Sequence, residues 1–217
     1  MNFEYKEYPP LPEWLVKHLL VLLEQHKVKP TKYDDEFKNR MLREAEAWLN
    51  GADEEVLDAI AVLDFDESDS IGYQFTDPKA YAYSETLAKF GFITVDDVVN
   101  DWVAENIPEK VIGVNLQAMY GGTLITPHID ELRHYALNYT IETGGTNVST
   151  NFYVPAANFK DYKVYARTCI PFERIELTES HIISTNRWHK INVESIHSVT
   201  NIDINKERIA LSCSIVR

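Results

Sequence analysis

The stretch RIALSCSI, residues 208–215, alternates between two kinds of side chain. One set is apolar and comprises Ile209, Leu211, Cys213 and Ile215. The other set is one charged residue with three small ones and comprises Arg208, Ala210, Ser212 and Ser214. Successive side chains of a β-strand point to opposite faces of the sheet. The stretch therefore predicts a strand that packs one face on helices and lines a pocket with the other.

The same period of two extends outward from this stretch through the second half of the chain. Residues 110–120 alternate in this way, and Tyr135 to Ile141 splits into two faces likewise. The pattern is interrupted at Gly144-Gly145, Pro155 and Pro171, which are residues typical of turns. We therefore predict that residues 110–217 form a β-rich core.

The first half of the chain has the helical period instead. Helices are predicted over Glu13 to Lys27, from about Asp34 to Asn50, over Asp53 to Leu63, and from Thr94 to the residues before Pro108. Residues 1–109 are therefore expected to be mainly helical support for the β-rich part. Since the sequence shows no internal repeat and no low-complexity linker, we expect one α+β domain spanning residues 1–217.

Composition narrows the function classes. The chain has 217 residues, 45% of them apolar, and a formal net charge of −13. The apolar content is sufficient for a core, and the acidic balance argues against a nucleic-acid or anionic-membrane partner. With no long apolar run or signal-peptide pattern, we expect a soluble cytoplasmic protein. Cys169 and Cys213, the only cysteines, are expected to be reduced core residues.

His128 and Asp130 are the first candidate metal ligands. They lie two positions apart in a segment of strand character, so both side chains are expected on one face. Chance alone supplies about one His-x-acid triplet in a chain with 7 His and 34 acidic residues, so the pair by itself is weak. A second imidazole from a distant strand would complete two His and one carboxylate, an arrangement typical of non-haem Fe(II) oxygenases.

Two residues compete to be that second imidazole. We choose His197, because only eleven positions separate it from Arg208, about the length of a strand, a turn and the start of the next strand. His189 follows Trp188 and is interpreted as a surface His or one that supports the site from behind the ligands. The predicted metal ligands and catalytic residues are therefore His128, Asp130 and His197.

Arg208 is the main candidate for binding an anionic ligand. An Arg among small residues of an otherwise apolar strand is costly to bury without an anionic partner, and its guanidinium suits a carboxylate held by two parallel hydrogen bonds. Tyr120 could add a phenol hydrogen bond, and Asn138 and Ser212 are weaker candidates. Each of these also has an ordinary packing or surface interpretation.

Taken together, these residues resemble the Fe(II)/2-oxoglutarate-dependent oxygenases, in particular their prolyl-hydroxylase-like branch. The likeness covers residues 110–217 and rests on Tyr120-Gly121-Gly122, Pro127-His128-Ile129-Asp130, Leu137-Asn138, His197-Ser198-Val199, Asn201 and Arg208-Ile209-Ala210-Leu211-Ser212. It implies a double-stranded β-helix (jelly roll) with N-terminal helices packed on its major sheet. It also implies Fe(II), O2, 2-oxoglutarate as cosubstrate with its far carboxylate on Arg208, and ascorbate as a further candidate cofactor.

The implied reaction hydroxylates an unactivated C–H bond and releases succinate and CO2. A prolyl or other peptidyl side chain is the first expectation for the substrate, and a small molecule such as a free amino acid is the second. Ala210 and the Gly- and Asn-rich segment Thr143–Thr150 depart from some relatives. Two alternatives stay open: a cupin-type metalloenzyme, which Gly122 and His128 resemble in spacing, and a β-helix binding module without turnover.

Overall fold

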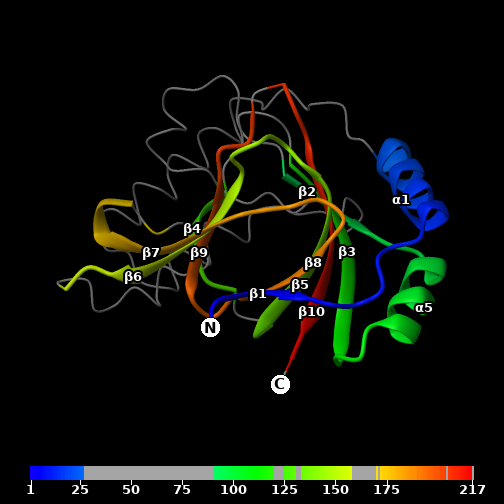
Figure 1. Ribbon diagram of the computed structural model, residues 1–217, viewed down its shortest axis with the longest axis horizontal. Helices are drawn as coiled ribbons and strands as arrows, with labels where there is room; N and C mark the ends of the chain where they lie inside the picture. The colour runs from blue at the N-terminus through cyan, green and yellow to red at the C-terminus, as the bar shows by residue number, and fades with distance from the viewer. Residues whose placement is uncertain are drawn as a thin grey trace, which may run out of the picture.

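Two antiparallel β-sheets face each other in the computed structural model, which describes residues 1–26, 90–119, 125–130, 133–157, 170, 172–203 and 205–216 (Figure 1). The major sheet has six strands in the order β1 (Phe3–Lys6), β8 (Trp188–Asn192), β5 (Tyr135–Thr143), β10 (Arg208–Ile215), β3 (Val111–Met119) and β2 (Phe90–Thr94). The minor sheet has four strands in the order β4 (Ile125–His128), β9 (Ile196–Thr200), β6 (Ser149–Pro155) and β7 (Ile175–Ile182).

The chain path identifies the fold. Among the described strands from β3 to β10, every connection crosses from one sheet to the other except the one between β6 and β7. That winding places the order β3-β10-β5-β8 in one sheet opposite β4-β9-β6-β7 in the other, which is a double-stranded β-helix. The predicted fold class is confirmed. A short 3-10 helix, Phe172–Arg174, precedes β7.

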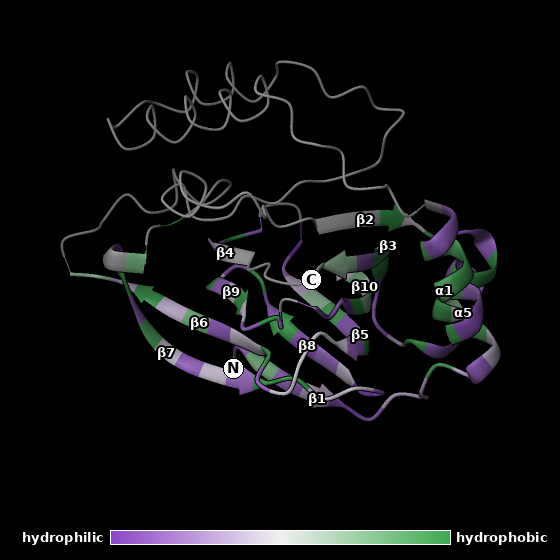
Figure 2. Ribbon diagram, turned by 90° about the horizontal axis from the view of Figure 1, so that it is seen from above, coloured by the Kyte–Doolittle hydropathy of each residue, from purple (hydrophilic) through white to green (hydrophobic). Residues whose placement is uncertain are grey.

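Within the described ranges, two helices cover the outer face of the major sheet. Helix α1 (Glu13–His26) buries Leu15, Leu19 and Leu23, which are spaced four residues apart and lie on one side of the helix. Helix α5 (Asp97–Asn106) buries Val99 and Val103 in the same way. Figure 2 shows both helices at one side of the major sheet, away from β6 and β7. The helix predicted from Glu13 to Lys27 is confirmed over Glu13–His26, and Lys27 lies outside the described residues.

The other N-terminal predictions need correction. The helix expected from Thr94 begins at Asp97, because Asp96 caps it: the Asp96 carboxylate accepts a hydrogen bond from the backbone N–H of Val99. Thr94 instead ends β2. Strands β1 and β2 extend the two edges of the major sheet, so residues 1–109 contribute strands as well as helices. The helices predicted from Asp34 and over Asp53 to Leu63 lie outside the described residues.

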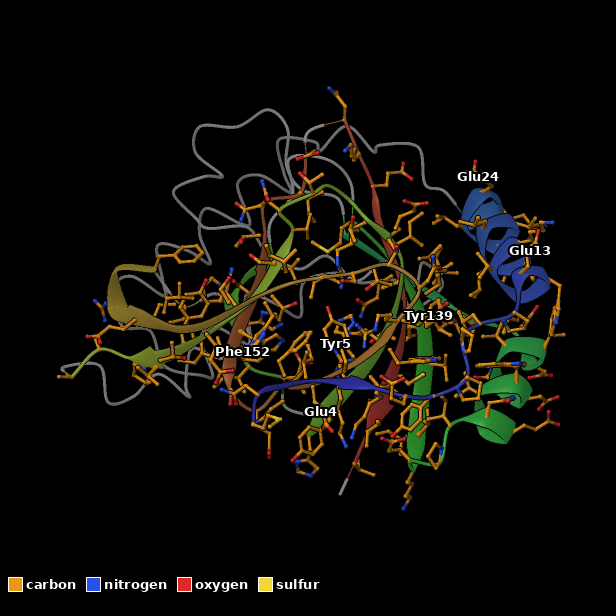
Figure 3. All side chains as sticks on the ribbon, in the orientation of Figure 1. Glu4, Tyr5, Glu13, Glu24, Tyr139 and Phe152 are labelled. Carbon is orange, nitrogen blue, oxygen red and sulfur yellow. The ribbon has the colours of Figure 1, made fainter. Side chains whose placement is uncertain are left out.

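The two faces of β10 divide as predicted. Ile209, Leu211 and Cys213 belong to the main apolar core, which α1 and α5 complete. Arg208 and Ser212 are also buried, but they point to the space between the two sheets. Figure 3 shows the same division through two labelled aromatic residues: Tyr139 lies on the side of the helices, and Phe152 lies on the minor sheet.

Three sequence expectations have different outcomes. Cys213 is a free, buried cysteine, as expected, whereas Cys169 lies outside the described residues. Among the helices that the structure describes, none is both long and apolar enough to cross a membrane. The expectation of a single domain over residues 1–217 stays a prediction.

The packing of α1 leads to a first prediction. Leu15→Ala should lower the free energy of unfolding by about 2–5 kcal/mol, because it leaves a cavity where α1 meets the major sheet. Trp14→Ala is the matched control on the same helix, because the Trp14 side chain is 54% exposed. Its loss should stay below about 1 kcal/mol. Urea denaturation followed by circular dichroism compares the two, and equal losses would contradict this packing.

Candidate metal centre

The pairing of β4 with β9 brings two imidazoles together. In this antiparallel pair His128 is the direct cross-strand partner of His197. Residues opposed in this way project from the same face of the sheet. Accordingly, the ring centroids of His128 and His197 lie 4.3 Å apart, with the ring planes inclined at 46°. Both side chains are buried.

Asp130 joins this pair from a loop. Strand β4 ends at His128, so Asp130 lies just after the strand and not on it as expected. The backbone N–H of Asp130 donates to the carbonyl of Val193 at 2.9 Å. The two side chains still converge, because Asp130 Oδ1 lies 3.3 Å from His128 Nε2. One potential ligand atom from each of His128, Asp130 and His197 lies within 4.8 Å of the others.

A backbone hydrogen bond selects the tautomer of His197. Its Nδ1 lies 3.0 Å from the carbonyl oxygen of Ser195, which can only accept, so Nδ1 carries the proton and Nε2 keeps its lone pair. Burial, reinforced by the charge of His128, lowers the pKa of His197 to about 3. The ring is therefore neutral at pH 7, as a metal ligand must be.

Asp130 is held in its ionised form. Burial would raise the pKa of this carboxyl, but the hydrogen bond with His128 and the positive charge of Arg133 outweigh that effect and hold the pKa far below its usual range. Arg133 Nε donates to Asp130 Oδ2 at 2.6 Å. Sequence reasoning missed Arg133, because a spacing of three residues in a loop does not indicate which side chains meet.

Arg208 is a buried cation on the inner face of the major sheet. Its side chain is 2% exposed, its Nε has no hydrogen-bond partner, and Nη1 lies 3.8 Å from the sulfur of Met119. No carboxylate of the described residues pairs with it. Burial lowers the pKa of Arg208 to about 10, so the guanidinium still carries its charge at pH 7. Such a charge is costly to bury unless an anion joins it.

Gly144 helps to set the position of Arg208. It follows β5 with φ of +80°, a conformation that favours glycine. A Cβ added there would lie 3.0 Å from Cβ of Arg208, so the turn packs directly against the start of β10. The carbonyl of Gly144 also accepts a hydrogen bond from the backbone N–H of Asp203 at 2.8 Å. The segment Thr143–Thr150, which departs from some relatives, thus supports the Arg208 region.

Further buried side-chain oxygens on the inner faces of the sheets have no hydrogen-bond partner in the described part of the protein. They are Asn138 Oδ1, Thr140 Oγ1 and Thr150 Oγ1. Leaving such a group unsatisfied costs about 1–3 kcal/mol. A polar ligand bound between the sheets would satisfy these groups. The interpretation of His189 as a surface residue is wrong, because β8 points its ring inward and leaves it 0% exposed.

The remaining predicted site residues have separate outcomes. Ser212 Oγ accepts a hydrogen bond from Arg133 Nη1 at 3.3 Å, so its contact is with Arg133. Asn138 is the cross-strand partner of both Ser212 on β10 and His189 on β8, and the three form a row across the major sheet. Tyr120 lies outside the described residues.

Comparisons with known proteins find likeness only in structure. No protein-family model and no curated protein matches the sequence. A 2OG-Fe(II) oxygenase-family oxidoreductase from Burkholderia pseudomallei has 8% identity and a TM-score of 0.38, over 58% of this chain and 66% of that protein. A Pseudomonas putida prolyl-4-hydroxylase has 10% identity and a TM-score of 0.44, over 100% of this chain and 93% of that protein. A cupin superfamily protein from Desulfitobacterium hafniense has 6% identity and a TM-score of 0.34, over 68% of this chain and 96% of that protein. The case for a function therefore rests on the site itself.

The buried ring of His189 leads to a second prediction. Burial, followed by the charge of Arg208, lowers the pKa of His189 from 6.5 to about 3. Between these values the unfolded chain binds a proton at His189 that the folded protein does not, so stability falls as pH falls through this window. The contribution is about 1.4 kcal/mol per pH unit. Urea denaturation from pH 7.5 to 4.5 should show a correspondingly shallower fall for His189→Gln than for the unaltered protein. Parallel curves would contradict the assignment.

Proposed function

We propose that the chain is an Fe(II)- and 2-oxoglutarate-dependent dioxygenase that hydroxylates an unactivated C–H bond. The observation that carries the proposal is the convergence of His128, Asp130 and His197 from two paired strands and the loop after one of them. These ligand types, with coordination positions left open, are typical of non-haem Fe(II) oxygenases.

The donor spacing is compatible with one metal ion. Ligand atoms about 2.1 Å from an ion and at right angles to each other are about 3 Å apart. His128 Nε2 and Asp130 Oδ1, at 3.3 Å, are near this spacing. A neutral imidazole and an ionised carboxylate are also the protonation states that ligands need. The donor types and their protonation states therefore suit a ferrous ion held by His128, Asp130 and His197.

Arg208 supports 2-oxoglutarate as the cosubstrate. A buried guanidinium without a carboxylate partner among the described residues suits the far carboxylate of a dicarboxylate ligand. On the same inner face, the Thr140 hydroxyl has no partner among the described residues and could donate a further hydrogen bond. A cupin-type metalloenzyme that does not use 2-oxoglutarate is the alternative. It is less well supported, because the site has Asp130 where the cupin motif continues with a second His, and because it leaves Arg208 without a function.

The proposed overall reaction is balanced: 2-oxoglutarate, O2 and R–H give succinate, CO2 and R–OH. A bound ferrous ion would supply open coordination positions and the redox chemistry. The protein supplies three ligands in fixed protonation states, the Arg208 charge that orients the cosubstrate, and buried surroundings that exclude water. The reaction requires 2-oxoglutarate, O2 and R–H to be bound near one another, so contacts that orient the cosubstrate, such as the one from Arg208, would control the rate of turnover.

The substrate is proposed at the level of chemical class. A prolyl or other peptidyl side chain is our first proposal, and a free amino acid or other small molecule is the second. The other alternative to the proposed function, besides the cupin-type enzyme, is a binding module that retains the fold without turnover. Formation of succinate that depends on both Fe(II) and 2-oxoglutarate separates the oxygenase from the binding module and from the cupin-type enzyme.

Removal of a ligand tests the metal site. His128→Ala and His197→Ala should each weaken Fe(II) binding under anaerobic conditions by on the order of 100-fold or more, since even the outer partners of metal ligands are worth 10–100-fold. His134→Ala is the control, because this half-exposed imidazole pairs with Glu194 at 2.7 Å and lies outside the trio. Full metal affinity in His197→Ala, with the fold retained, would remove it as a ligand.

Arg208→Met tests the cosubstrate assignment by two opposite effects. Loss of the charge-assisted contact should weaken 2-oxoglutarate binding by about 2–4 kcal/mol. The free energy of unfolding without ligand should hold or rise, because an apolar side chain of similar length replaces a buried charge. Calorimetry with Fe(II) under anaerobic conditions measures the first effect, and urea denaturation the second. Arg187→Met, at an exposed arginine, is the control. An unchanged dissociation constant in Arg208→Met would contradict the assignment.

A further inference from the structure

The carboxylate of Asp130 is positioned by contacts outside the regular strand. Strand β4 ends two residues earlier, and its pairing with β9 is irregular between Ile125 and His128. Sheet hydrogen bonds therefore do not determine where the side chain of Asp130 points. Its backbone is tied to Val193, but a carboxylate can still rotate about its own bonds. Its orientation must come from side-chain contacts.

Arg133 provides the closest of these contacts and separates the two carboxylate oxygens. Arg133 Nε donates to Asp130 Oδ2 at 2.6 Å, while Oδ1 lies 3.3 Å from His128 Nε2. One oxygen is thus engaged by the guanidinium and the other faces the imidazole pair. A charge-assisted hydrogen bond of this length is among the stronger contacts that a carboxylate makes.

The guanidinium of Arg133 is itself anchored to the opposite sheet. Its Nη1 lies 3.3 Å from Ser212 Oγ and 3.5 Å from Ser214 Oγ. Both serines lie on β10, which pairs with β3 on one side and β5 on the other. Arg133 therefore links the loop that carries Asp130 to the middle of the major sheet. This also gives a reason for the small polar residues on the inner face of β10.

We propose that Arg133 is a positioning residue that holds Asp130 Oδ2 and presents only Oδ1 to a metal ion. The inference rests on the proposed metal site. A positive charge beside a cation site does not increase attraction for the cation, so the effect of the contact is on geometry: one-oxygen binding leaves more coordination positions open than two-oxygen binding would.

Substitution of Arg133 tests this with a spectroscopic readout. Co(II) is the probe, because its visible absorption depends on the number and arrangement of its ligands. In Arg133→Met the absorption spectrum of bound Co(II) should change, because Asp130 Oδ2 is then free to bind the ion as well. Arg187→Met is the matched control at an exposed arginine that pairs with Glu7, and the spectrum should be unchanged.

The outcomes separate this inference from the proposed function. If the unaltered protein binds Co(II) and His128→Ala removes that binding, the proposed metal site is supported. In that case an unchanged Co(II) spectrum in Arg133→Met overturns only the role of Arg133. If the unaltered protein does not bind Co(II), both ideas fail. Should Arg133→Met not fold, Arg133→Gln is judged by the same spectral criterion, because the shorter amide cannot span from Asp130 to β10. A loss of stability with an unchanged spectrum would mean that Arg133 only holds the loop.

Discussion

The pairing of β4 with β9 is the constraint on which the rest of the site depends. It places His128 opposite His197 although the two are 69 positions apart in the chain. The double-stranded β-helix makes this pairing possible because the chain returns to the minor sheet between β8 and β10, where β9 lies beside β4. Backbone hydrogen bonds of the minor sheet then hold the two imidazoles on one face, so the protein bears the cost of bringing them together during folding rather than on ligand binding.

The major sheet separates stability from chemistry by its two faces. Its outer face joins the apolar core under α1 and α5, and this burial stabilises the fold. Its inner face carries Arg208 Nε, Asn138 Oδ1 and Thr140 Oγ1, which lack hydrogen-bond partners in the described part of the protein. These groups make the ligand-free protein less stable than an apolar interior would. A polar ligand that hydrogen-bonds to these groups would offset this loss of stability when it binds.

Within the site, neighbouring groups set each other's protonation. Ser195 fixes the tautomer of His197, and burial keeps that ring neutral. Asp130 stays ionised because His128 and Arg133 offset the effect of its burial. Arg133 in turn contacts Ser212 and Ser214 on the major sheet. The position of Asp130, which follows a strand of the minor sheet, therefore also depends on contacts with the major sheet. The site therefore depends on both sheets keeping their relative position.

The sequence by itself determined the elements whose signals are local. Alternation over residues 208–215 predicted both faces of β10, and the apolar stretch from Glu13 to Lys27 predicted α1, because such patterns follow from local backbone geometry. Chemistry and spacing also suggested the three candidate ligands. Only the tertiary structure decided that Asp130 reaches His128 from a loop, that Arg133 donates a hydrogen bond to Asp130, and that His189 is buried. Loop conformation and sheet closure depend on contacts between distant segments, and spacing along the chain does not by itself determine those contacts.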